Sequence, residues 1–123
     1  MVSTQATQIE IYRLLYHLGL TANYKGFFHL SRAMELCMLQ PERLQFITKQ
    51  VYRDVARQFS TTWTAVERNI RTAVRLIWQT HRPQLEALAG RPLQQKPTNA
   101  KLLAILVHSF PSGRTQSDDP QSA

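Results

Sequence analysis

The apolar residues of this chain recur at intervals of three and four residues, and sustained strand-like alternation is absent. This spacing predicts helices along nearly the whole chain, with Gly19 and Gly90 as stop signals and Pro41 as a start signal. Six or seven short helices in about 110 residues predict an all-α fold, a compact orthogonal bundle. The predicted helices cover about residues 6–18, 25–39, 41–51, 52–59, 62–79, 83–89 and 99–107.

The chain has 123 residues, enough for one domain with a core. Residues 111–123 lack any large apolar side chain, so we expect a domain over residues 1–110 followed by a disordered tail. Cys37 is the one cysteine and lies among apolar residues, which predicts a core thiol and excludes an internal disulfide. The chain shows neither a membrane-length apolar run nor a signal peptide, so we expect a cytoplasmic protein.

The charge balance points to a polyanionic partner. Lysine and arginine number 15 against 8 acidic residues, a net charge of +7, and eleven of the cations are arginine. The guanidinium fork of arginine suits phosphates and guanine edges better than a lysine ammonium does. DNA, RNA and an anionic membrane surface all remain candidates at this point.

Residues 52–79 have the pattern of a helix-turn-helix. The small Ala56 is followed ten residues later by Val66 and then, after four more, by Ile70, while Phe59 is expected to close the first helix onto the core. This is the packing skeleton of a motif whose second helix, here about Thr62–Gln79, enters the major groove. Ser60 stands where many such turns carry glycine, which a serine can replace if the turn needs no positive φ.

The predicted second helix has two distinct faces. With Ile70 taken as the inward direction, the side chains within about 40° of it are apolar, at ~100° per residue. The opposite face is polar and holds three arginines, which could meet DNA or simply be solvated. The inward residues are Trp63, Val66, Val74 and Ile77, and the outward ones are Thr64, Arg68, Arg71, Arg75 and Gln79.

A resemblance to one known family is carried by residues 47–78, which read ITKQVYRDVARQFSTTWTAVERNIRTAVRLIW. They resemble the C-terminal DNA-binding effector domain of the sporulation master response regulators (stage 0 sporulation protein A). LGLTANYKGFFHLSRAM at 18–34 is similar to the opening of that domain, and KPTN at 96–99 to its loop before the last helix. Three motifs in the right order over about residues 16–107 make the resemblance specific.

The resemblance implies a nucleoid-associated bacterial transcription regulator that binds short boxes in double-stranded DNA, often as a tandem homodimer. The expected base-reading residues are Thr64, Glu67 and Arg68, and the expected phosphate-binding residues are Arg71, Arg75, Lys96 and Thr98. An arginine can bond guanine through two donors, and a glutamate can accept from a cytosine amino group. Cations further along such a helix usually meet phosphate. Thr98 could equally be only a helix cap.

Several positions depart from the family pattern. Ala65 stands where an arginine is usual, so one DNA contact is missing, and Trp63 replaces a small residue. The family's contact surface for the RNA polymerase sigma factor corresponds to the divergent residues 81–90. Only about 15 residues precede the match, too few for the family's phosphorylatable receiver domain. The chain is either a free-standing effector domain or a fragment, with Met1 favouring a natural start.

Other functions have weaker support. The four histidines are dispersed and form no metal-ligand spacing with Cys37, and no glycine-rich phosphate loop is present, so we expect neither an enzyme nor a cofactor. A protein-interaction module that dimerises with or modulates a full-length regulator is the main alternative. Binding of the basic helix to a membrane surface, anchored by Trp63 and Trp78, is a third possibility.

Overall fold

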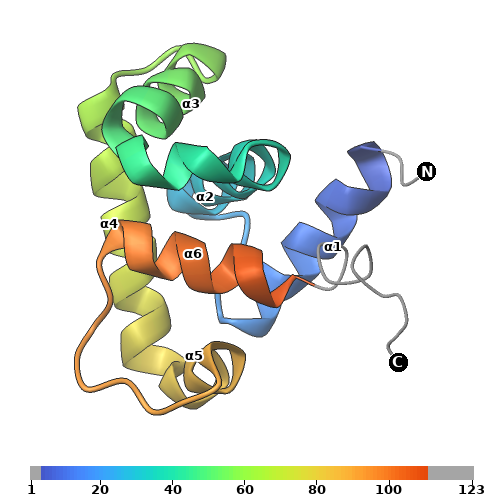
Figure 1. The fold of residues 1–123 in the computed structure, drawn as a ribbon, viewed down its shortest axis with the longest axis vertical. Helices are drawn as coiled ribbons and strands as arrows, with labels where there is room; N and C mark the ends of the chain where they lie inside the picture. Colours follow the sequence, from blue (N-terminus) through green and yellow to red (C-terminus); the bar gives the residue numbers. More distant parts are fainter. Residues whose placement is uncertain (1–3, 111–123) are drawn as a thin grey trace.

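The computed structural model describes residues 4–110, and these residues form a bundle of helices without a strand (Figure 1). The all-α prediction is confirmed, whereas the expected tail at 111–123 lies outside the described residues. No helix in the described part of the chain is long and apolar enough to cross a membrane. The α-helices are α1 (Thr4–His17), α2 (Lys25–Leu39), α3 (Arg53–Gln58), α4 (Trp63–Thr80), α5 (Arg82–Ala89) and α6 (Asn99–Ser109).

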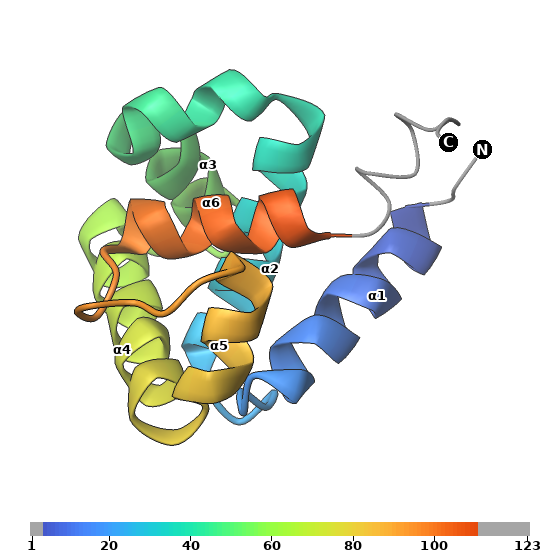
Figure 2. The same cartoon turned by 60° about the horizontal axis from the view of Figure 1, so that its bottom comes forward.

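Helix α2 lies at the centre and packs against α1, α4 and α6 (Figures 1 and 2). Its buried face carries Phe27, Leu30 and Met34, which are at most 1% exposed. Gly26 sits where α2 meets α4, because a Cβ at this position would lie 2.4 Å from the Asn69 carbonyl oxygen. The two helices can therefore approach closely only because residue 26 has no side chain. In both views α1 lies on the opposite side of the molecule from α4.

Helices α1, α3 and α5 are each followed, within two residues of their last residue, by a residue with left-handed backbone conformation. These residues are Gly19, Ser60 and Gly90, with φ values of 90°, 54° and 77°. The two glycines are the stop signals that the sequence predicts. The condition under which serine was said to replace glycine at position 60 is not met, because Ser60 adopts a positive φ.

The prediction of one regular helix over residues 41–51 is also wrong. This segment consists of a 3-10 helix, η1 (Pro41–Phe46), followed by a π-helical turn, η2 (Thr48–Tyr52). The guanidinium of Arg43 donates to the Gln50 carbonyl and, at 2.7 Å, to the Asp54 carboxylate, which folds the two turns against each other. Hydrogen bonds of this kind are tertiary, so apolar spacing along the sequence does not report them.

Candidate nucleic-acid interface

Helices α3 and α4 form a helix-turn-helix whose turn is fixed by backbone and side-chain hydrogen bonds. The Thr61 N–H donates to the Ala56 carbonyl across 2.9 Å, and the longer Ser60 bond to Arg57 measures 3.4 Å. The hydroxyl oxygen of Thr62 accepts from the Ala65 N–H at 3.1 Å and so caps the start of α4. The predicted turn at 60–62 is therefore present, and its last residue begins the second helix.

The inner face of α4 forms part of the core, as its spacing predicts. Its buried residues are Val66, Ile70, Ala73, Val74 and Ile77. Ala56 of α3 is 5% exposed. The Ala56, Val66 and Ile70 positions of the predicted packing skeleton are therefore buried, and Phe59 is the exception.

Two aromatic residues near the turn are less buried than the sequence predicts. Phe59 and Trp63 are each 38% exposed, although both were expected to pack on the core. The ring of Phe59 lies instead against the ring of His29 in α2, with 5.1 Å between centroids. An inward direction on a helical wheel therefore does not ensure burial at the end of α3 or in the first turn of α4.

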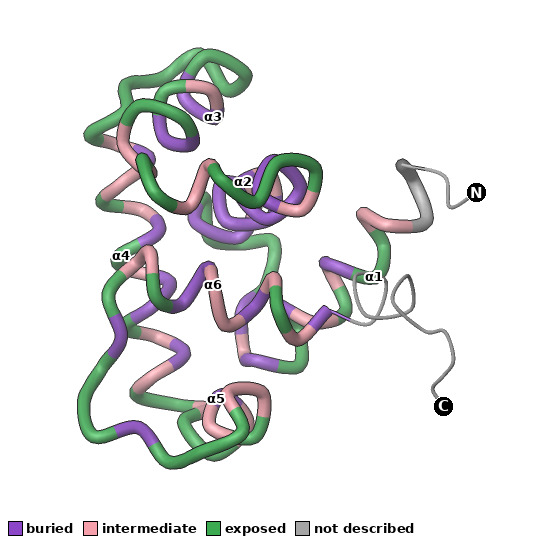
Figure 3. Tube along the Cα trace, viewed as in Figure 1, coloured by how far each residue is buried: buried purple, intermediate pink, exposed green. Residues whose placement is uncertain are grey.

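The outer face of α4 is exposed along its length (Figure 3), and the residues that the sequence places there lie there. Thr64, Arg68, Arg71, Arg75 and Gln79 are all exposed. No hydrogen bond or ion pair to the described residues is formed by Arg68 or Arg75. Residues 49–82, which include α3 and α4, hold seven cations and two acids, a net charge of +5. The charged residues of α4 itself are three arginines and Glu67, so its outer face is positive, and two of the arginines are available to a ligand.

Glu67 is the acidic exception on this face, and Arg71 holds its side chain. The Nε and Nη2 atoms of Arg71 donate to the two carboxylate oxygens of Glu67, each across 3.1 Å. The pair is partly exposed, with 32% of the Glu67 side chain and 59% of the Arg71 side chain accessible. Spacing of four residues on a helix allows such a pair, although separate DNA contacts were expected of the two residues. The second terminal nitrogen of Arg71, Nη1, forms no bond to the described residues.

The start of α6 meets the middle of α4, so the KPTN loop lies beside Glu67 (Figures 1 and 2). The Asn99 amide nitrogen donates to the Glu67 carbonyl oxygen at 3.2 Å and to the Tyr52 hydroxyl oxygen at 3.0 Å. Thr98 caps α6 by accepting from the Lys101 N–H at 3.1 Å, which confirms the capping role. Sequence reasoning missed Asn99 and Tyr52, although Asn99 belongs to the KPTN motif that carries the resemblance.

Against α4 lies a buried histidine, His29. Its Nδ1 atom is 3.4 Å from the Asn69 amide nitrogen of α4. Burial, and secondarily the positive charge of Lys25, lowers the pKa of His29. The imidazole is therefore neutral at pH 7, and it can accept a hydrogen bond from Asn69.

The cysteine thiol has the chemistry of a packed interior. Cys37 is fully buried, as predicted, and burial raises the pKa of its thiol to about 11. Within residues that the structure describes, no three His, Cys, Asp or Glu side chains gather where they could hold a metal ion.

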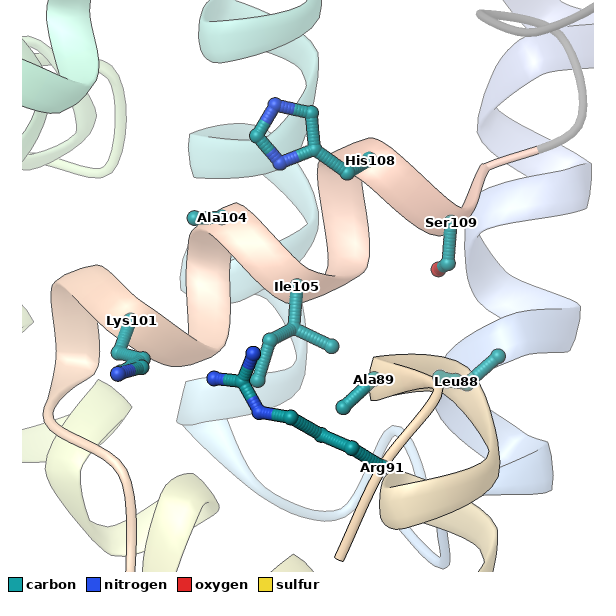
Figure 4. A pocket seen from close by; sticks show the side chains of 8 residues that line it. All are labelled: Leu88, Ala89, Arg91, Lys101, Ala104, Ile105, His108 and Ser109. Carbon is teal, nitrogen blue, oxygen red and sulfur yellow. The ribbon is translucent and has the colours of Figure 1, made fainter. Parts of the chain in front are cut away.

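A shallow groove lies between α5 and α6, away from the outer face of α4 (Figure 4). Its cavity measures about 260 Å³. Aliphatic side chains form the floor, and two cations, Arg91 and Lys101, lie along it. The lining residues are Leu88, Ala89, Arg91, Lys101, Ala104, Ile105, His108 and Ser109.

A helix-turn-helix within an all-α bundle, with a cationic outer face on its second helix, defines the class of helix-turn-helix DNA-binding domains. Residues 11–110 match the family model described as sporulation initiation factor Spo0A C terminal, and the chain belongs to that family. The match covers all of α2 through α6 and the second half of α1. The resemblance seen in the sequence is thereby confirmed, and the chain is a DNA-binding effector domain of a sporulation regulator.

Proposed function

We propose that this domain binds specific sequences in double-stranded DNA and regulates transcription, with α4 lying in the major groove. The observation that carries the proposal is the outer face of α4, where an oriented carboxylate and two uncommitted arginines follow a capped helix start. The first turns of such a helix lie nearest to the bases. The membrane alternative has no comparable support, because Trp78 is half-buried and lies 4.1 Å from the Arg82 guanidinium carbon instead of projecting freely.

Base reading is assigned to Thr64, Glu67 and Arg68. Arg68 is exposed and has no partner among the described residues, so its guanidinium can bond a guanine through two donors. Glu67 is held by Arg71 with its carboxylate oxygens as acceptors, which suits a cytosine amino group. The hydroxyl of Thr64 lies 3.1 Å from that of Thr62 and can donate or accept at the start of the helix.

Phosphate binding is assigned to Arg71, Arg75, Lys96 and Thr98. Arg71 can keep its pair with Glu67 and still donate from Nη1, because the pair uses only its other two nitrogens. Arg75 lies one turn further along the exposed face. Lys96 is exposed beside the start of α6, and Thr98 caps that start through its oxygen while its hydroxyl proton stays available to a phosphate.

The test is fluorescence anisotropy of the full chain on two duplexes, across a salt series. One duplex carries a TGTCGAA-like box, the kind of short box that the family resemblance suggests, and the other is scrambled. We expect tighter binding to the box and a steep loss of affinity with salt on both duplexes. Equal affinity for the two duplexes would refute sequence specificity. Loss of binding to both at modest salt would refute DNA binding by this chain.

Two substitutions separate the proposed roles, and a third is a charge-matched control. Arg68→Ala should cost ~1–3 kcal/mol on the box and reduce the preference for it. Arg75→Ala should weaken binding to both duplexes alike. It should also reduce the slope of log affinity against log salt concentration by about one. Arg13→Ala removes the same charge from an exposed position on α1, remote from α4, and should change neither preference nor slope by a comparable amount.

Two further partners are proposed from the family. A second copy should bind beside the first on a duplex with two tandem boxes, giving a complex of two chains per duplex in sedimentation velocity. A sigma factor would contact α5, which corresponds to the segment at 81–90. Charge-reversing substitution of exposed Arg82 should then reduce activated transcription without changing box affinity.

The alternative function, a protein-interaction module, is favoured by the groove between α5 and α6. Its aliphatic floor and the cations Arg91 and Lys101 suit a partner segment that combines acidic and apolar side chains. If this is the main function, Ala104→Glu should abolish partner capture and leave DNA affinity intact. Arg68→Ala should then leave capture unchanged.

A further inference from the structure

We propose that Asn99 is a positioning residue that sets the placement of Glu67 against the bases, an inference that rests on the proposed DNA-binding function. Asn99 is the first residue of α6 and follows the capping residue Thr98. It is half-buried, and its amide nitrogen is directed to the Tyr52 hydroxyl and the Glu67 carbonyl. Its role would therefore be exerted through Glu67, with no contact of its own to DNA.

The geometry joins three elements that lie far apart in the sequence. One amide nitrogen bonds the Tyr52 hydroxyl, 47 residues earlier, and the Glu67 carbonyl, 32 residues earlier. Tyr52 ends η2 and is 4% exposed, so it is a fixed point in the core from which the amide is oriented. The amide thus ties α6 and the segment before the helix-turn-helix to the middle of α4.

The bond to Glu67 is not required for α4 to be helical. Within the helix the Glu67 carbonyl is the regular acceptor for the N–H four residues later. A carbonyl oxygen has two lone pairs, and Asn99 supplies a second donor from another element. A donor added at that one carbonyl restrains where the helix sits relative to α6. Glu67 is then restrained twice, through its backbone by Asn99 and through its carboxylate by Arg71.

The position of Asn99 matters because the start of α6, where Asn99 lies, also carries the proposed phosphate contacts. Lys96 and Thr98 lie within three residues of Asn99, and phosphate contacts fix the orientation of a protein on the duplex. A hydrogen bond weakens steeply with poor distance and angle, so a base contact needs its helix in a fixed place relative to those phosphates. Asn99 is the direct link between the phosphate-binding loop and the reading residue.

The experiment measures the affinity of the full chain for the box and for a set of boxes with each base pair changed in turn. Glu67→Ala first identifies the base pair that Glu67 reads. Asn99→Ala should then lose about tenfold of the preference at that same base pair, within the ~1–3 kcal/mol that one base contact is worth. The preference read by Arg68 should persist, and the double variant Glu67→Ala with Asn99→Ala should lose no more than Glu67→Ala alone.

Two other variants distinguish positioning from a general loosening of α6. Thr98→Ala removes the cap of α6 but leaves the Asn99 amide. It should weaken binding to all boxes alike, without changing the preference at the base pair that Glu67 reads. Tyr52→Phe removes the hydroxyl and keeps the ring, and should reduce that preference in the same direction as Asn99→Ala. It provides the measurement if Asn99→Ala does not fold, as monitored by circular dichroism.

The inference is overturned if the folded Asn99→Ala chain, or Tyr52→Phe in its place, keeps the wild-type preference at the Glu67 base pair. It is also overturned if Asn99→Ala lowers the affinity for every box equally. Failure of the proposed function gives a different result, because the wild-type chain would then show no preference among the boxes at all.

Discussion

Ser60 offers a direct test of how the turn of the helix-turn-helix is held. The residue ends α3 in a left-handed conformation, with φ at 54°. The bonds around it, from Thr61 to Ala56 and from Ser60 to Arg57, form the pattern in which glycine is preferred at this position. The same pattern ends α1 at Gly19 and α5 at Gly90. We therefore expect Ser60→Gly to stabilise the domain.

The magnitude follows from two opposing contributions. A side chain with a Cβ costs roughly 1–2 kcal/mol in the left-handed region, and glycine avoids this cost. Glycine loses more backbone entropy on folding, which costs roughly 0.5–1 kcal/mol relative to a residue with a side chain. Ser60 is exposed and its hydroxyl forms no hydrogen bond with the described residues, so no contact is lost. The net gain is about 0.5–1 kcal/mol.

The assay is thermal unfolding followed by circular dichroism, with urea unfolding as an independent measure. For a domain of about 100 residues the gain should raise Tm by roughly 2–6 °C. Thr61→Gly is the matched control: this neighbouring exposed residue has no positive φ, so the entropy cost should make the variant less stable. A Ser60→Gly variant no more stable than the wild type would refute the reasoning, as would equal effects of the two substitutions.

Three more predictions concern the packing and titration of the fold. Gly26→Ala should destabilise the domain by about 1–3 kcal/mol in urea unfolding, since the new Cβ meets the Asn69 carbonyl; wild-type stability would contradict the close approach of α2 and α4. Cys37 should resist maleimide at pH 8 until urea unfolds the chain, because burial raises its pKa to about 11; labelling of the native protein at the unfolded rate would contradict its burial. The Arg43 hydrogen bond lowers the pKa of Asp54, so its stabilising effect is present at neutral pH and is lost as the pH falls through the folded-state pKa. Asp54→Asn should therefore be less stable than the wild type at pH 7, and the difference should shrink below roughly pH 4; a difference independent of pH would contradict the pairing.

The parts of the fold that the sequence predicts well are those with local causes. The predicted second helix, 25–39, has the bounds of α2, and the stop signals Gly19 and Gly90 do end their helices. Thr98 begins α6 as its capping role predicts. The segment at 41–51 was wrong because its conformation follows from the tertiary hydrogen bonds of Arg43, which leave no trace in apolar spacing.

The candidate site likewise has features that the sequence predicts from local spacing and one that depends on tertiary packing. The outward direction of Arg68, Arg71 and Arg75 follows from helical periodicity alone, and the structure has all three exposed. The pair between Glu67 and Arg71 was predictable in principle from its four-residue spacing. The bond from Asn99 to Glu67 was not, since it depends on how α6 docks on α4, and nothing in residues 96–99 by themselves specifies that docking.

The outer face of α4 therefore combines a hydrogen-bond acceptor that is held in place, Glu67, with a donor that is not, Arg68. This difference bears on how the face would select DNA. Arg68 has no partner, so binding must order a side chain with about 2 kcal/mol of rotamer entropy. Glu67 is already held by Arg71, and its carboxylate would repel a phosphate or a base edge that presents only acceptors. A fixed negative charge within a positive face adds little to the affinity for DNA in general. Its main effect is to lower the affinity for sequences that do not match. On this argument Arg68 contributes both to the strength of binding and to base preference, whereas Glu67 contributes mostly to selectivity, which is why the placement of Glu67 would be worth restraining from two sides.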